Sequence, residues 1–180
     1  MKKKPITVAV SGAFDPIHIG HIAYLREAAK LGDRLVVILN NDIFLLRKKG
    51  FVFRPVEDRK AILEAIKGVD EVIVSIDDDQ TVCKTLEQLK PDIFAEGGYW
   101  IGPEDIPEAE TCQAIGCRIV TNVGGSKIRA DKELDSKLKG FNRHEAGKME
   151  IECPYCADHP ILKERCLHCK GRGKVDVGRE

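Results

Sequence analysis

Two sets of residues in this chain have types and spacings that could do chemistry. The first is the pair His18 and His21, in the stretch SGAFDPIHIGH that follows the apolar run ITVAV. The second is a set of four cysteines in two C-x-x-C pairs: Cys153, Cys156, Cys166 and Cys169. Imidazoles can bind a phosphate or a metal, and four thiolates can bind zinc. The use of each set depends on the elements that position it.

The histidine pair stands where a strand is expected to pass into a helix. We expect the strand to end near Ser11, a turn over residues 12–17, and a helix that opens at His18. Side chains three residues apart share one face of a helix, so both imidazoles should face the turn. Backbone N–H groups and the positive end of the helix dipole favour an anion there, and Gly12 and Gly20 leave room for it. The pair therefore suits a polyphosphate.

Other uses of the histidines are disfavoured. A zinc site would need a third ligand, and this half of the chain has no other histidine. The turn carries neither the P-loop pattern G-x-x-x-x-G-K-[ST] nor the dinucleotide pattern G-x-G-x-x-G. A P-loop NTPase and a nicotinamide enzyme are both poor interpretations of this turn.

The surrounding sequence alternates between strand and helix patterns. Short, β-branched apolar runs typical of strands covered on both faces occupy residues 6–10, 35–39, 72–76, 92–96 and 117–121. Helical patterns occupy residues 22–31, 57–68, 81–90 and 104–116. Gly32, Gly68 and Gly116 stand where helix C-terminal glycines belong. This alternation predicts an α/β fold, with a doubly wound, Rossmann-like parallel sheet of five strands and a ligand beyond their carboxyl ends.

Length and composition limit what else the chain can be. Its 180 residues, 43% of them hydrophobic, can bury one core and carry a small appendage. The 29 basic and 29 acidic residues balance, so no overall field draws the chain to nucleic acid or to an anionic membrane. No run approaches the roughly 20 apolar residues of a membrane span. We expect a soluble, cytoplasmic protein with one domain over residues 1–140 and a second segment over residues 148–177.

The motifs resemble those of a known enzyme family. The stretch GAFDPIHIGH resembles the G-x-F-D-x-x-H-x-G-H signature of the cytidylyltransferase-like nucleotidyltransferases. Further resemblances to that family are Leu31-Gly32-Asp33, Lys49-Gly50, Arg54-Pro55-Val56, Asp58-Arg59, Val69-Asp70, Pro91-Asp92 and Glu96-Gly97-Gly98-Tyr99. The resemblance covers residues 6–129 and implies the sheet of the HxGH nucleotidyltransferases. Class I aminoacyl-tRNA synthetases share H-I-G-H, but they are much longer and carry a K-M-S-K-S sequence that is absent here.

The resemblance implies a reaction in which a small phosphorylated alcohol or sugar attacks the α-phosphorus of CTP or ATP and pyrophosphate leaves. His18 and His21 would hydrogen-bond the α- and β-phosphates, and Lys49 would add positive charge from a flexible loop. Mg²⁺ would bridge the phosphates. CTP is slightly favoured over ATP, and a homodimer is the usual arrangement in the family.

Other residues take binding roles from the same resemblance. The turn residues Gly12, Ala13 and Phe14 would line the phosphates, and Asp15 would form the turn rather than act as the sole metal ligand. Gly97 and Gly98 would contact the base. Tyr99, Trp100 and residues 101–108 are candidates for contact with the acceptor, whose identity the sequence does not give, although Trp100 could equally pack against the sheet edge.

The second signature of the family departs from its usual form. Ser126 and Arg129, in the stretch GSKIR, stand where the family has threonine-rich motifs. Ser126 would cap a helix and meet a phosphate oxygen, and Arg129 would reach the β- or γ-phosphate. The missing threonines leave a second hypothesis open: a nucleotide-sensing regulatory or nucleic-acid-binding protein with a catalytically impaired domain.

The cysteine segment predicts a structural zinc site. Seven cysteines, an odd number, argue against a disulfide framework, and paired C-x-x-C elements nine residues apart are typical of Zn²⁺ bound by four thiolates. A redox C-x-x-C or an iron–sulfur cluster is a weaker interpretation. Basic residues in the segment could touch nucleic acid, but acidic neighbours dilute their field, so a structural appendage is favoured.

Overall fold

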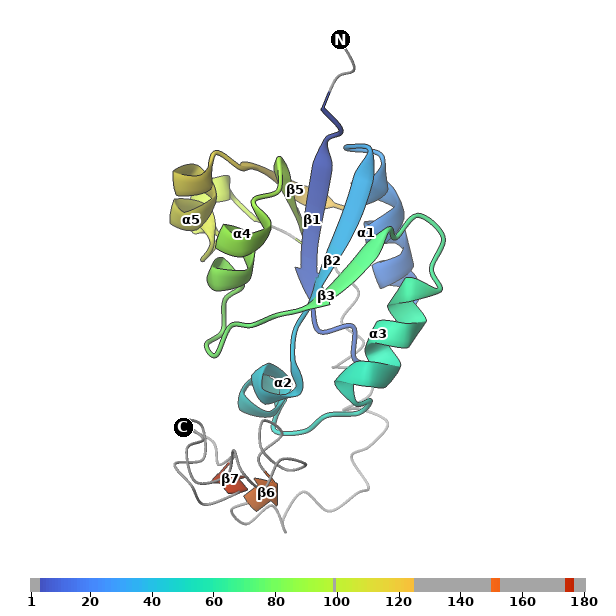
Figure 1. Cartoon of the computed structure of the whole chain (residues 1–180), viewed down its shortest axis with the longest axis vertical. Helices are drawn as coiled ribbons and strands as arrows, with labels where there is room; N and C mark the ends of the chain where they lie inside the picture. The colour runs from blue at the N-terminus through green and yellow to red at the C-terminus, as the bar shows by residue number, and fades with distance from the viewer. Residues whose placement is uncertain (1–3, 99, 125–149, 153–173, 177–180) are drawn as a thin grey trace.

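The computed structural model describes residues 4–98, 100–124, 150–152 and 174–176 of the chain. Five parallel strands form one sheet in the order β3-β2-β1-β4-β5 (Figure 1). The strands are β1 (Thr7–Gly12), β2 (Arg34–Leu39), β3 (Glu71–Val74), β4 (Ile93–Gly97) and β5 (Arg118–Val123). The central strand β1 pairs with β2 from Thr7 opposite Arg34 onward, and with β4 from Val8 opposite Ile93. The predicted five-stranded parallel sheet is confirmed.

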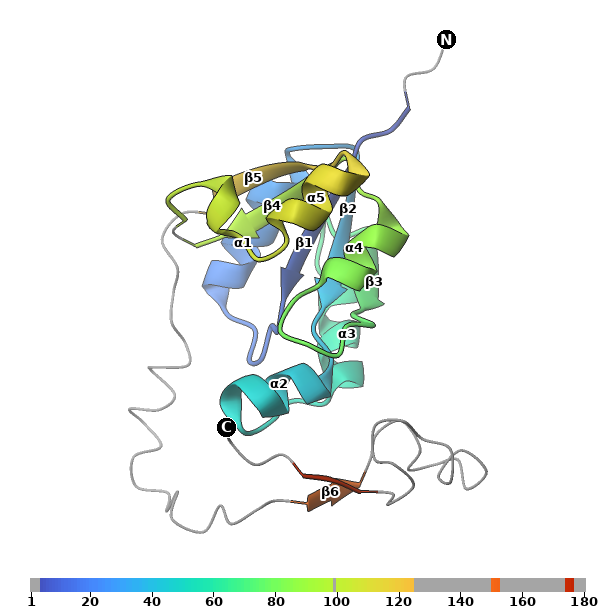
Figure 2. The same cartoon turned by 90° about the vertical axis from the view of Figure 1, so that its left-hand side faces the viewer.

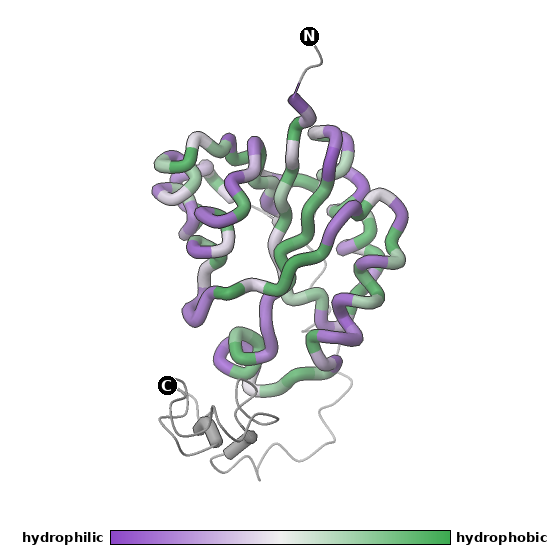
Figure 3. The backbone as a smooth tube through the Cα atoms, in the orientation of Figure 1, coloured by the Kyte–Doolittle hydropathy of each residue, from purple (hydrophilic) through white to green (hydrophobic). Residues whose placement is uncertain are grey.

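Helices cover both faces of this sheet (Figures 1 and 2). On one face lie α1 (Ile19–Ala29) and α3 (Val56–Glu64), and on the other lie α4 (Cys83–Leu89) and α5 (Ala109–Ile115), with a short 3₁₀ helix η1 (Pro103–Asp105) before α5. Helix α2 (Asp42–Lys49) lies beyond the carboxyl ends of the strands (Figure 1). Val8 and Val10 of β1 pack on one face with α1 and α3, whereas Ala9 packs on the other with α4 and α5. The apolar strands lie at the centre of the molecule (Figure 3). The alternation of side chains along β1 thus divides one sheet between two cores.

One helix, α2, was not predicted from the sequence. Helix α2 begins after Asn41, whose side chain accepts a hydrogen bond from the Phe44 N–H, and ends at Gly50 in the left-handed conformation with φ of 80°. Asn before the helix and Gly after it are ordinary cap signals. Gly116 caps α5 as predicted. The C-cap residues of α1 and α3 are instead Lys30 and Ala65, ahead of the glycines expected there.

The C-terminal part of the chain contributes one small element to the description. Strands β6 (Glu150–Glu152) and β7 (Lys174–Asp176) pair antiparallel, with Glu152 opposite Lys174. The chain before and after residues 153–173 therefore comes together at this pair. The four cysteines lie outside the described residues, so the zinc appendage and the domain boundary stay predictions. No described helix has the length and apolar character needed to cross a membrane.

Candidate active site

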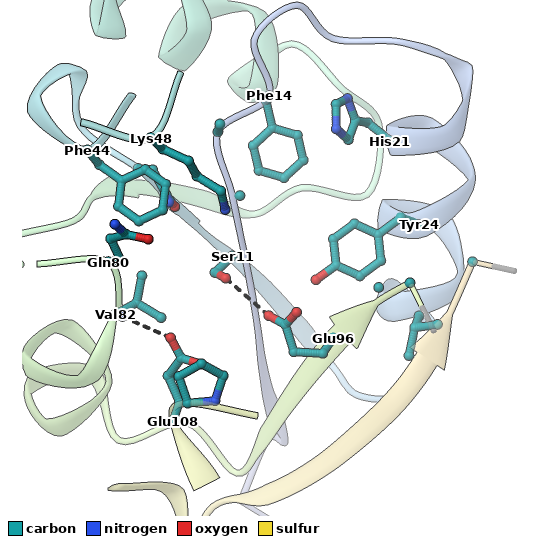
Figure 4. Close-up of a pocket in the computed structure, with 18 of the residues that line it drawn as sticks. Ser11, Phe14, His21, Tyr24, Phe44, Lys48, Gln80, Val82, Glu96 and Glu108 are labelled. Carbon is teal, nitrogen blue, oxygen red and sulfur yellow. Dashed lines mark hydrogen bonds between the residues drawn. The ribbon is translucent and has the colours of Figure 1, made fainter. Parts of the chain in front are cut away.

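A cavity of about 370 Å³ opens at the carboxyl ends of the strands. Its wall includes Ser11 at the end of β1, Asn40 after β2, Gly97 at the end of β4 and Gly124 after β5. The strand order reverses between β1 and β4, and ligands of open α/β sheets bind at such a switch point. The close-up in Figure 4 looks into this cavity.

The two histidines stand together at the start of α1, as predicted. His18 is the N-cap residue, and its Nδ1 accepts a hydrogen bond from the Gly20 N–H at 3.1 Å. The Nδ1 of His21 accepts from the His18 N–H at 3.3 Å, and the two rings stack with centroids 3.7 Å apart. A neutral imidazole has one donor and one acceptor nitrogen, so rings that accept through Nδ1 carry their hydrogen on Nε2. The pair can therefore offer two adjacent N–H donors to an anion.

His21 is held in its neutral form. Burial, and then the positive charges of His18 and Lys49, lower the pKa of His21 to about 3. The ring also makes an edge contact with Phe14, with centroids 4.9 Å apart. At physiological pH His21 is thus an oriented, uncharged hydrogen-bond donor that can meet a phosphate oxygen.

Asp15 fastens the turn between β1 and α1. This buried carboxylate accepts hydrogen bonds from the Phe53 N–H at 2.9 Å and from the Arg54 N–H at 2.8 Å. Each oxygen has a backbone partner, which agrees with the predicted turn-forming role.

The position of Lys49 corrects the sequence analysis. Lys49 is the last residue of α2 rather than part of a flexible loop, and its Nζ donates to the Asp15 carbonyl at 2.7 Å. This hydrogen bond holds the ammonium against the phosphate turn. The Gly50 cap fixes the end of α2, which carries Lys49. Lys49 therefore provides a positioned positive charge at the cavity wall.

Arg59 organises the site, which sequence reasoning did not recognise. Its side chain is 1% exposed and donates to the carbonyl oxygens of Ala13, Asn40 and Arg54 at 2.7, 2.9 and 2.9 Å. A further donor reaches the Asp42 carboxylate. One buried guanidinium thus joins the turns after β1 and β2 to the segment before α3. The D-R pair matched the family pattern, but only the fold shows what this arginine holds.

The carboxylate Glu96 was also missed as a site residue. It stands at the end of β4, where its Oε1 accepts a hydrogen bond from the Ser11 hydroxyl at 3.1 Å (Figure 4). Beside it, Tyr24 donates its hydroxyl hydrogen to the Ala95 carbonyl at 2.6 Å. Burial, and then the charge of Glu96, raise the pKa of Tyr24 well above its usual value. A carboxylate at the switch point was not expected from strand patterns, because they do not show which strand ends are neighbours.

The remaining predicted residues divide into two groups. Gly97 and Gly98 line the cavity, and the Trp100 Nε1 donates to the Gly97 carbonyl at 3.2 Å while its ring packs against the core beneath α4 and α5. Ser126, Arg129 and Tyr99 lie outside the described residues. Their predicted roles stay predictions.

The donor set of the cavity bears on the expected magnesium ion. Among the described residues, no group of three or more His, Cys, Asp or Glu side chains could hold a metal by itself. Mg²⁺ commonly binds through one or two carboxylates together with substrate phosphates. Glu96 fits that pattern as a carboxylate in the cavity wall, so the site suits a magnesium ion that arrives with a polyphosphate.

A parallel sheet of this order, with a cavity at its switch point and paired imidazole donors, defines an α/β protein of the Rossmann-like, nucleotide-binding class. Residues 9–115 match the family model described as cytidylyltransferase-like. The chain therefore belongs to the cytidylyltransferase-like family, and its sheet and site form a nucleotidyltransferase domain.

Individual relatives agree with this assignment. The chain is 33% identical over 162 residues to an FAD synthase of Archaeoglobus fulgidus, covering 89% of this chain and 97% of that protein. It is 41% identical over 131 residues to the bifunctional protein HldE of Hahella chejuensis, covering 72% of this chain. The match spans only 25% of that longer protein. A lipopolysaccharide core biosynthesis protein of Thermoplasma volcanium aligns in structure with a TM-score of 0.59 and 31% identity, covering 69% of this chain and 100% of that chain.

Proposed function

We propose that this protein transfers AMP from ATP to a small phosphorylated acceptor and releases pyrophosphate. The observation that carries the proposal is the stacked His18 and His21 pair, fixed through Nδ1 so that each ring offers an N–H donor at the cavity. The family membership supports nucleotidyl transfer. ATP is preferred over CTP here because one relative is an FAD synthase, and FAD contains an adenylyl group.

The proposed reaction needs no covalent enzyme intermediate. An oxygen of the acceptor phosphate forms a bond to the α-phosphorus of ATP, and the bond from that phosphorus to the bridging oxygen of the β-phosphate breaks. Pyrophosphate leaves with the electron pair of that bond. Catalysis of such a transfer depends mainly on positioning and on the neutralisation of charge on the phosphate oxygens.

The residues of this chain are suited to those two tasks. The imidazole N–H groups of His18 and His21 would orient the phosphates, and Lys49 would offset the charge that develops on the leaving pyrophosphate. Bound Mg²⁺ would neutralise phosphate charge, and Glu96 would help to hold it. Arg59 holds the turns after β1 and β2 together through the Ala13 and Asn40 carbonyls, which would keep the imidazole N–H donors aligned.

Pyrophosphate release tests the proposal. The purified protein is incubated with Mg²⁺, each of the four NTPs in turn, and a panel of phosphorylated alcohols, sugars and FMN. We expect release with ATP and at least one acceptor, and a loss of about 100-fold or more in His18→Ala and His21→Ala. Lys60→Ala, on the exposed side of α3, serves as the control and should keep full activity.

The same experiment separates the proposal from its rival. The unusual second signature around Ser126 favours, as a second candidate, a nucleotide sensor without turnover. Tight binding of one NTP, with no pyrophosphate from any acceptor, would support the sensor and reject the transferase.

We further propose that Cys153, Cys156, Cys166 and Cys169 bind one structural Zn²⁺. The C-x-x-C spacing supports this proposal, as does the β6–β7 pair, which brings together the chain ends that flank the cysteines. Elemental analysis of protein purified without added metal should give one zinc per chain, and Cys153→Ser should lower that ratio. A ratio of zero in the unsubstituted protein, with full nucleotide binding, would contradict the proposal.

A further inference from the structure

Helix α2 carries two lysines to the cavity, although it lies outside the layers of the sheet. It lies beyond the carboxyl ends of the strands (Figure 1), and Lys48 and Lys49 at its end line the cavity. Its eight residues form a helix about 12 Å long. A tilt of about 5° at the first residue would therefore move the last residue by about 1 Å. The contacts that set the direction of α2 thus determine where the Lys49 ammonium lies.

The side chain of Asn41 makes such contacts at the start of this helix. Asn41 is 9% exposed, and its Oδ1 accepts a hydrogen bond from the Phe44 N–H at 2.9 Å, which caps α2. Its Nδ2 donates to the carbonyl oxygens of Ser75 and Asp77 at 3.1 and 3.0 Å. These acceptors lie 34 and 36 residues farther along the chain. One amide therefore joins the first turn of α2 to the segment after β3.

A helix cap by itself does not require the amide of Asn41. Asn, Asp and Ser are about equally good caps, because each supplies one acceptor oxygen. Of these three residue types only Asn carries an NH₂ group with two donors, and both acceptors of the Asn41 Nδ2 are carbonyls of the segment after β3. A buried carbonyl oxygen that loses its donor stays desolvated and unpaired. The two donated hydrogen bonds therefore indicate a role beyond the cap.

The segment that accepts these hydrogen bonds is itself tied down. The Asp77 carboxylate is 2% exposed and accepts from the Ser75 hydroxyl at 2.9 Å. It also accepts from the Lys84 N–H at 2.7 Å and from the N–H and the hydroxyl of Thr85. Lys84 and Thr85 lie in the first turn of α4. The carbonyls that Asn41 binds are thus fixed to α4, and they give α2 a firm reference position.

A second hydrogen bond from α2 reaches the same segment. The Arg47 guanidinium donates to the Asp78 carbonyl. Beyond Asp78 the chain forms part of the cavity wall at Gln80 and Val82, which lie across β1 from His21 (Figure 4). Helix α2 is therefore bonded to one wall of the cavity near both of its ends.

We propose that Asn41 is a positioning residue, which sets the direction of α2 through its two Nδ2 hydrogen bonds and so places the Lys49 ammonium at the phosphates of the nucleotide. The inference rests on the proposed function. Asn41 is not among the described residues that line the cavity, so it acts through Lys49 rather than on a substrate. The effect of this positioning is large, because a displacement of about 1 Å at a reacting site can lower the rate about 100-fold.

A double-mutant cycle on nucleotide binding tests this assignment. Asn41→Ser keeps a capping oxygen and removes both donors, and Lys49→Met removes the ammonium. Calorimetry with Mg²⁺ and α,β-methylene ATP, whose bridge between the α- and β-phosphates resists cleavage, measures the Kd. We expect Asn41→Ser to weaken binding about fivefold or more in the unsubstituted protein, but under about twofold in the Lys49→Met protein. Asn41→Ser should also make binding less sensitive to salt, as Lys49→Met should, because both remove the ammonium from its place.

Two further variants separate positioning from a general loss of stability. Asp33 accepts a hydrogen bond from the Ile6 N–H at 2.8 Å, at the amino ends of the strands and away from the cavity. Asp33→Ala should lower the urea midpoint and leave the Kd for the nucleotide within about twofold. Asn41→Asp keeps the cap but turns a carboxylate oxygen toward the Ser75 and Asp77 carbonyls, so it should weaken binding more than Asn41→Ser does.

The outcomes distinguish a failure of this inference from a failure of the proposed function. Equal losses of affinity from Asn41→Ser with and without Lys49, an unchanged salt dependence, or no loss at all would overturn the role of Asn41. If nucleotide binds but no acceptor gives pyrophosphate, the transferase proposal fails, and the cycle still determines whether Asn41 acts through Lys49. If the unsubstituted protein does not bind the ATP analogue, both proposals are rejected.

Discussion

Replacement of Arg59 by methionine should destabilise the protein and loosen its phosphate turn. Methionine keeps most of the apolar stem but removes the guanidinium, which is buried and donates to three carbonyl oxygens and to Asp42. The three carbonyl acceptors lie in the turns after β1 and β2 and in the segment before α3, so the loss of these hydrogen bonds should disturb the site itself.

The magnitude follows from the number and burial of these bonds. Removing one partner of a buried ion pair costs about 3–5 kcal/mol, because the other groups stay desolvated. Four hydrogen bonds of about 1 kcal/mol each give a similar sum. The Asp42 side chain is 27% exposed and can recover some solvation, so we expect about 3–4 kcal/mol. With a urea m-value of about 2 kcal/mol/M, the unfolding midpoint should fall by roughly 1.5–2 M.

Urea unfolding followed by circular dichroism measures this loss, and a second arginine provides the control. Arg54 pairs with Asp58 at 3.7 Å, and both side chains are more than half exposed, so Arg54→Met should cost under about 1 kcal/mol. Arg59→Lys should lie between the two, because lysine keeps the charge but loses the planar fork. If Arg59→Met shifts the urea midpoint no more than Arg54→Met does, the proposal that Arg59 holds the turns after β1 and β2 together is wrong.

Three further predictions concern single positions. Gly124 has φ of +84°, and a Cβ there would lie 2.5 Å from the Tyr24 Cα, so Gly124→Ala should lower the free energy of unfolding by about 2–5 kcal/mol. Gly116 has φ of +73° but nothing close to its Cβ position, so Gly116→Ala should lower it by only about 1 kcal/mol. Equal shifts in the melting temperature of the two variants would contradict this prediction. The pKa of His21 is about 3 in the folded protein, whereas an unperturbed histidine has a pKa of 6.5. The contribution of His21 to stability is therefore complete above about pH 6.5 and is lost as the pH falls toward 3, at up to about 1.4 kcal/mol per pH unit. Urea midpoints from pH 6 to pH 4 should therefore fall less steeply in His21→Asn, and parallel slopes would count against this assignment. Lys49→Met should weaken ATP binding about tenfold or more in calorimetry and make it less sensitive to salt, whereas unchanged affinity would remove Lys49 from the phosphate site.

The structure explains why some of the site was visible in the sequence. The histidine pair and the turn glycine depend on local geometry, and a strand followed by a capped helix fixes that geometry within a few residues. Asp15 differs, because its partners Phe53 and Arg54 lie in a distant segment that only the fold brings to the turn. Helix α2 was missed because it is short and carries a run of three basic residues, although Asn41 and Gly50 mark its ends. As a result Lys49 was placed in a loop, whereas the helix end holds it against the turn.

The chain by itself determined the alternation of strands and helices, the identity of the phosphate-binding turn and the family signature, because these follow from short-range periodicity and from contiguous motifs. Only the tertiary structure decided which strand ends are neighbours. The order β3-β2-β1-β4-β5 brings Glu96 to Ser11, Arg59 to Ala13 and Asn40, and Glu108 to Val82, over separations of up to 85 residues. Pairing across such distances depends on how the whole sheet buries its two faces, which no local pattern records.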